Sequence, residues 1–65
     1  MTAETMKRRI RARMVFLGLN GEEMAARMHM STGSWSRRMR FPGRITVDEL
    51  IRIEKILKCK LLTED

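Results

Sequence analysis

The sequence predicts a single all-α domain of four to five helices. Apolar residues recur three and four positions apart in several segments, which is the spacing of one helix face. Asn, Ser and Thr, which cap helix N-termini well, come directly before three of these segments. No segment alternates convincingly as a strand does, and 65 residues suffice for one domain with a small core.

The first helix is predicted over about 5–17. Ile10, Met14 and Leu17 fall at offsets of four and seven and form one apolar stripe. Gly18 follows directly and is placed to end the helix in the left-handed conformation that glycine permits.

The second helix is predicted over 21–28. Asn20 is a good N-cap, and Glu23, three residues later, completes a capping box. The small side chain of Ala25, in the middle of this helix, lets another helix backbone come close.

The third helix is predicted over 32–40, with Ser31 as its N-cap. Trp35 and Met39 lie four residues apart and form its inward face. Stacking of Trp35 on an unpaired base is the less favoured alternative to this core position. The helix should end before Pro42, because the residue before a proline resists the helical conformation.

The fourth helix is predicted over 47–58. Thr46 and Glu49 have the spacing of a capping box, so the helix should begin directly after Thr46. Its apolar residues define a broad inward face: Leu50, Ile53, Ile56 and Leu57.

Positive charge is concentrated in the first two-thirds of the chain. The net charge is +6, but residues 1–44 hold ten Lys and Arg against three acids, whereas residues 45–65 hold four against five. A polyanion is the natural partner of such a surface.

The predicted second and third helices are separated by only a few residues, which is the arrangement of a helix-turn-helix. The second helix of that motif can enter the major groove of DNA. Double-stranded DNA is therefore the partner that the spacing and the charge both favour.

These segments together resemble the lambdoid phage repressor and Cro-type helix-turn-helix family, the XRE family. The residues that carry the resemblance are 17–20 (LGLN), 23–28 (EMAARM), 30–31 (MS) and 46–57, and it extends over about 8–62. It implies a lambda-repressor-like fold and a sequence-selective regulator of phage or bacterial transcription that acts by occupying an operator.

The resemblance also implies two sets of contact residues. Arg37 is the strongest base-reading candidate, because arginine pairs with guanine through two hydrogen bonds; the alternative is a phosphate contact or a solvated side chain. The predicted base-reading residues are Thr32, Gly33, Ser36 and Arg37. The predicted phosphate-contacting residues are Arg13, Asn20, Gly21, Ser34, Arg38, Arg40 and Arg44.

Three residues depart from the family pattern. His29 stands where a glycine is usual in the turn, and a left-handed backbone costs a residue with a side chain about 1 kcal/mol. Gly33 weakens the recognition helix by about 1 kcal/mol and brings no side chain to a base. Arg38 occupies a position that is usually apolar, and Met39 should replace it in the core.

A monomer of this size contacts few bases, so we expect a homodimer on a palindromic operator, with half-sites about 34 Å apart. The interface is expected in the C-terminal third, where Ile51, Leu61 and Leu62 can leave apolar surface. The alternative function is a protein-interaction module that binds another regulator or a polymerase subunit.

The sequence does not favour an enzyme. Cys59 and His29 are the only Cys and His, too few for a metal site or a Cys–His nucleophile, and no cofactor is expected. The lone cysteine and the lack of a long apolar run favour a cytoplasmic protein. A membrane-surface role for the basic first helix is a less favoured alternative.

Overall fold

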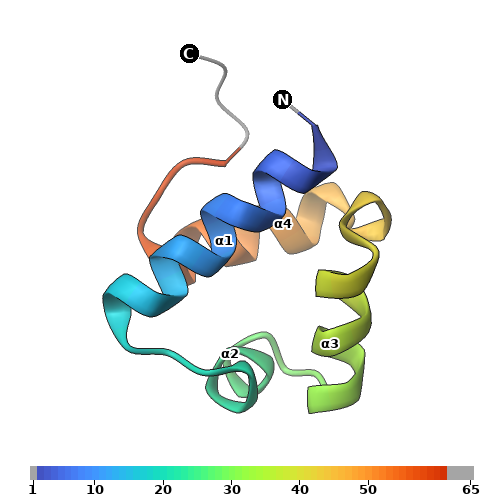
Figure 1. Cartoon of the computed structure of the whole chain (residues 1–65). Helices are drawn as coiled ribbons and strands as arrows, with labels where there is room; N and C mark the ends of the chain where they lie inside the picture. The colour runs from blue at the N-terminus through green and yellow to red at the C-terminus, as the bar shows by residue number, and fades with distance from the viewer. Residues whose placement is uncertain (1, 62–65) are drawn as a thin grey trace.

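The computed structural model describes residues 2–61, and all regular structure in this part is helical. It consists of α1 (Ala3–Leu17), α2 (Gly21–Arg27), α3 (Thr32–Arg40), the 3-10 helix η1 (Pro42–Arg44) and α4 (Val47–Leu57). Figure 1 shows α1 lying across α4, with α2 and α3 together on one side of that pair. The predicted all-α fold is thus confirmed.

Side-chain caps set the starts of the helices as the sequence predicts. Asn20 Oδ1 accepts a hydrogen bond from the backbone N–H of Glu23 at 2.8 Å, and Glu23 Oε1 accepts one from the backbone N–H of Asn20 at 3.1 Å. Thr46 and Glu49 form the same reciprocal pair before α4, at 3.2 and 2.9 Å. Each pair satisfies two amide groups that a helix start would otherwise leave unbonded.

The predicted start of the first helix is wrong by two residues. Thr2 caps α1, because its Oγ1 accepts the Thr5 amide at 3.1 Å, and the helix begins at Ala3. Gly18 ends α1 with φ 71°, as predicted. Two predicted helix ends lie one residue too late, because Met28 and Lys58 are caps that follow the last helical residues.

The core lies where α1, α2, α3 and α4 meet, and methionine fills much of it. Five methionines are buried there, beside Trp35 and Ala25. Leu17, predicted to extend the stripe of α1, is 38% exposed because the helix ends there. The core consists of Met6, Ile10, Met14, Met24, Ala25, Met28, Trp35, Met39, Ile45, Leu50, Ile53, Leu57 and Leu61.

The segment after α4 folds back on the core. Lys58 turns the chain with φ 53°, and the Leu61 amide donates to Glu54 Oε2. Leu61 is 1% exposed, so the expectation that it offers apolar surface to a second copy is wrong. Ile51 keeps 39% of its surface, whereas Leu62 lies outside the described residues.

Candidate nucleic-acid interface

Four residues connect α2 to α3 and fix the angle at which α3 leaves. Met28 is buried, and His29 takes the left-handed conformation, with φ 58°, that the turn requires. Ser31 then caps α3, because its Oγ accepts the Ser34 amide at 3.1 Å. The predicted strained histidine is therefore present, and it allows two helices to pack after a very short connection.

One side of α3 is anchored in the core and the opposite side faces solvent. Trp35 and Met39 are 3% and 6% exposed, so the core holds two successive turns of the helix. Gly33, Arg37 and Arg40 follow one another at offsets of four and seven and are all exposed. A rigid helix thus presents a basic outer face.

The side chains of the arginines on that outer face have no partner among the described residues. The side chains of Arg37 and Arg40 form no hydrogen bond or ion pair with any residue from 2 to 61. Arg44, in η1, is also exposed and lies over the Phe41 ring at 5.5 Å from its centroid. All three side chains are therefore available to bind an anion.

Arg38 differs from its neighbours because it binds the protein itself. Its Nε donates to Glu49 Oε2 at 2.8 Å and ties α3 to α4. Burial raises the pKa of the Glu49 carboxyl, but hydrogen bonds from Thr46 and Arg38 outweigh this effect and leave the pKa below its ordinary value. The structure thus places this predicted phosphate-contacting residue in an internal ion pair.

Arg13 is also occupied within the protein. Its Nε donates to the Leu57 carbonyl at 3.1 Å, which satisfies an acceptor at the end of α4. Its guanidinium lies 4.8 Å from the centroid of the Phe16 ring. The structure therefore places this predicted phosphate-contacting residue at the seam between α1 and the end of α4.

The remaining predicted residues divide between exposed and occupied groups. Thr32 and Ser36 are exposed, whereas Ser34 is half-buried and accepts a hydrogen bond from the Ser31 hydroxyl at 3.0 Å. The backbone N–H of Asn20, a residue predicted to contact a phosphate, instead donates to Glu23 Oε1. Gly21 lies against Trp35, since a Cβ built on it would be 3.8 Å from the indole Cδ1.

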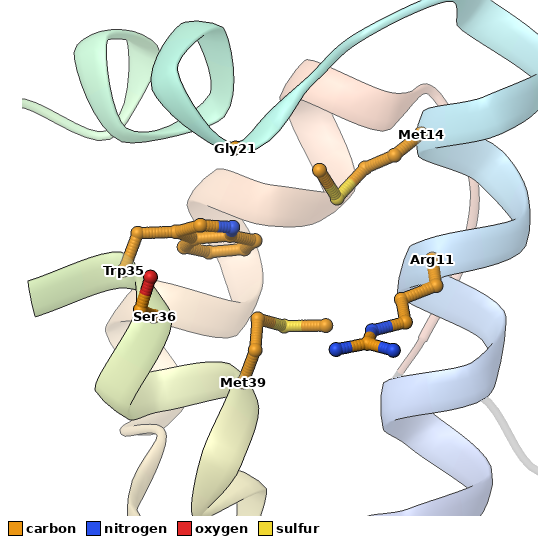
Figure 2. A pocket seen from close by; sticks show the side chains of 6 residues that line it. All are labelled: Arg11, Met14, Gly21, Trp35, Ser36 and Met39. Atoms are coloured by element: carbon orange, nitrogen blue, oxygen red, sulfur yellow. The ribbon is translucent and has the colours of Figure 1, made fainter. Parts of the chain in front are cut away.

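An open groove of about 290 Å³ lies between α1, the start of α2 and α3. Figure 2 shows the Arg11 guanidinium reaching from α1 toward Met39 of α3 across this groove. Sequence reasoning missed Arg11, although its place directly after the buried Ile10 puts it on a flank of α1. The groove is lined by Arg11, Met14, Gly21, Trp35, Ser36 and Met39.

Cys59 is a free, half-buried thiol beside Arg9 and Arg13. Burial raises the pKa of this thiol, an effect that Arg13 opposes and Glu54 reinforces. Among residues 2–61 there is no group of three or more Cys, His, Asp and Glu placed to hold a metal ion. The same part of the chain has no helix that is long and apolar enough to span a membrane.

Comparison of the chain with protein-family models, curated proteins and solved structures finds no match.

Proposed function

We propose that the protein binds double-stranded DNA through α2 and α3, which act as a helix-turn-helix with α3 as the recognition helix. The observation that carries this proposal is the exposed face of α3. Its two arginines, Arg37 and Arg40, have no partner among the described residues, while Trp35 and Met39 anchor the opposite face. Rigid anchoring and free donors are what base recognition needs.

The dimensions and the chemistry of α3 suit the major groove. A helix with its side chains is about 10–12 Å across, and the groove is about 12 Å wide. Gly33 and Ser36 are small, so the helix can approach the base edges closely. Arg37 can then donate two hydrogen bonds to one guanine, which discriminates against other bases by about 1–3 kcal/mol.

Phosphate contacts would supply most of the affinity. Arg40, at the end of α3, and Arg44, in η1, are exposed and lie just beyond the face that would read bases. Such contacts position a protein on the duplex without reading sequence. The net charge of +6 adds attraction toward any duplex at low salt.

The biological role that follows is regulation of transcription by operator occupancy in the cytoplasm. One copy of α3 spans too few base pairs to select a site in a genome, so two copies would bind a palindrome with half-sites about 34 Å apart. The exposed Ile51 of α4 is available for contact between the copies.

Fluorescence anisotropy with a labelled random duplex at two salt concentrations tests the proposal. Binding should be readily measured at low salt and should weaken steeply at moderate salt, because counterions are released at each phosphate contact. Replacing Arg37 and Arg40 by alanine should abolish most binding. The control is the charge-matched pair Arg52→Ala and Lys55→Ala on the exposed side of α4, which should retain it.

Selection of bound sequences from a random duplex pool would then show whether a preferred site exists. Two related half-sites would report the dimer. Equal affinity of all recovered sequences would contradict sequence-selective recognition.

A protein-interaction module is the second candidate, and one observation favours it. Val15 and Phe16, at the end of α1, are 79% and 75% exposed, which is unusual for neighbouring apolar residues. A partner protein could cover them. Absence of any duplex binding at low salt would favour this candidate over the first.

A further inference from the structure

The groove between α1 and α3 has the chemistry of a phosphate site, and we propose that it binds a phosphodiester group of the DNA backbone beside the recognition helix. This inference rests on the proposed function for the source of the phosphate. It adds Arg11 and Trp35, which lie outside the predicted contact residues, and it changes the role of Ser36.

The first observation is the indole of Trp35. Trp35 is only 3% exposed, yet no acceptor within residues 2–61 receives its Nε1–H. The nitrogen is not among the fully buried polar atoms, so it retains an opening to the outside. Figure 2 shows this nitrogen on the ring edge that is turned away from α3 and toward Met14.

An indole N–H usually has a hydrogen-bond partner. Because this one has no acceptor among the described residues, its partner comes from the groove, as water or as a ligand that replaces the water. Here the donor lies in the wall of a groove that is open to solvent. An acceptor that enters the groove from outside would satisfy it.

The second observation is the set of groups around that donor. Arg11 supplies a positive charge, and its side chain forms no hydrogen bond or ion pair with any residue that the structure describes. Ser36 supplies a hydroxyl, and none of the lining residues is acidic. A groove lined by a cation, a hydroxyl and an N–H donor favours an anion with several acceptor oxygens.

The floor of the groove strengthens this preference. Met14 and Met39 are 8% and 6% exposed and offer only apolar surface. They provide no strong acceptor to compete for the donors, and a less polar surrounding strengthens each charged hydrogen bond. The volume of about 290 Å³ leaves room for a phosphate group to enter from the open side.

The position of the groove relative to α3 identifies the source of the phosphate. Ser36 lines the groove and also lies one turn from both Thr32 and Arg40 on the exposed side of α3. When a helix occupies the major groove, backbone phosphates flank it on both sides. The groove between α1 and α3 lies on one flank of α3. We therefore assign Ser36 to the DNA backbone and not to a base.

The single tryptophan makes the test direct, because its indole N–H gives one proton NMR signal. Titration with a random duplex at low salt should shift this signal, and inorganic phosphate should shift it the same way at high concentration. Arg11→Gln should weaken duplex binding about tenfold on every sequence and reduce the salt slope by about one. Ser36→Ala should weaken it less and equally on every sequence.

Arg9→Gln is the matched control. It removes the same charge from an exposed position of α1, but Arg9 lines a different cavity, beside Cys59. It should change duplex affinity and the indole signal little.

The outcomes separate the site from the function. If the duplex binds but the indole signal does not move, and Arg11→Gln behaves like Arg9→Gln, the phosphate site is wrong and DNA binding stands. If the duplex does not bind but phosphate shifts the indole signal only when Arg11 is present, the proposed function is wrong and the anion site stands. If neither ligand has an effect, both are wrong.

Discussion

The two sides of α3 carry the same residue type with opposite consequences. Arg38 donates to Glu49 and joins α3 to α4, whereas Arg37, its neighbour in sequence, has no partner within residues 2–61. The arginine that packs against the protein stabilises the frame, and the arginine that faces away is available to a ligand. Charge alone therefore does not identify a binding residue. What matters is whether its side chain already has a partner within the fold.

The same contrast recurs on α1. Arg13 donates to the Leu57 carbonyl at the end of α4, whereas Arg11, two residues earlier, lines the groove beside α3. Two residues correspond to about 200° of rotation around a helix, so the two side chains lie on different flanks. The molecule thus separates a side held by α4 from a side open to a partner.

The largest effect should come from removing a buried residue of the frame. Ile53→Ala, at a site that is 1% exposed, should lower the free energy of unfolding by about 2–5 kcal/mol. Ile51→Ala on the same helix, at 39% exposure, should cost well under about 1 kcal/mol. Urea denaturation followed by circular dichroism measures both.

Because Ile53→Ala can unfold a domain of this size entirely, Ile53→Val provides a graded measurement. It should cost about 0.5–1.5 kcal/mol. Equal losses for the two alanine variants would contradict the assignment of α4's inward face.

The next largest effect concerns the open side of α3. Arg37→Ala should reduce the preference for the selected site over a random duplex by about 1–3 kcal/mol, because one paired guanine contact is lost. Arg44→Ala should instead weaken binding to both duplexes alike, since it would contact phosphate. Anisotropy titrations with the two duplexes separate these results.

For this pair the informative quantity is the ratio of the two affinities. An unchanged ratio in Arg37→Ala would rule out base reading by that residue and place it with the phosphate contacts.

A smaller effect is expected where a glycine weakens α3. Gly33 is an exposed helical residue, and a Cβ there would meet only Ser31 Oγ, at 4.0 Å. Gly33→Ala should therefore raise the free energy of unfolding by about 0.5–1 kcal/mol. Gly18→Ala should lower it by about 1 kcal/mol, because φ 71° strains any other residue. Thermal unfolding would show shifts of opposite sign.

Local features of the sequence predicted the frame well. Asn20, Ser31 and Thr46 act through neighbours three residues away, so their caps could be found without knowledge of the tertiary structure. The start of α1 differs from the prediction because Thr2 caps the helix through the backbone N–H of Thr5.

The partners of the arginine side chains could not be predicted in the same way. The Arg13 bond to the Leu57 carbonyl spans 44 positions of the sequence, and the Arg38–Glu49 pair depends on how α4 packs against α3. A resemblance transfers positions along the chain, but the flank of a helix that meets a partner is set by packing. For this reason the position of Arg11 in the groove follows from the tertiary structure and not from the sequence pattern.

The smallest predicted effect concerns the side of α3 that faces α4. Glu49→Gln keeps the size and the capping geometry but removes the charge that Arg38 binds. With side-chain exposures of 35% for Arg38 and 17% for Glu49, their coupling should be about 0.5 kcal/mol or less near neutral pH. A double-mutant cycle with Arg38→Gln, measured by urea denaturation, isolates this coupling from other effects of each change.

The coupling should depend on pH in one direction only. Folding lowers the pKa of the Glu49 carboxyl, so the folded protein holds the charged form more firmly than the unfolded chain does. The stabilisation is therefore complete above the unfolded-state pKa, about 4.3, and is lost as the pH falls through the folded-state value. A coupling that persisted after Glu49 had been protonated would show that Arg38 holds α4 by packing and not by charge. The side of α3 that faces α4 would then be held by packing contacts and not by an ion pair.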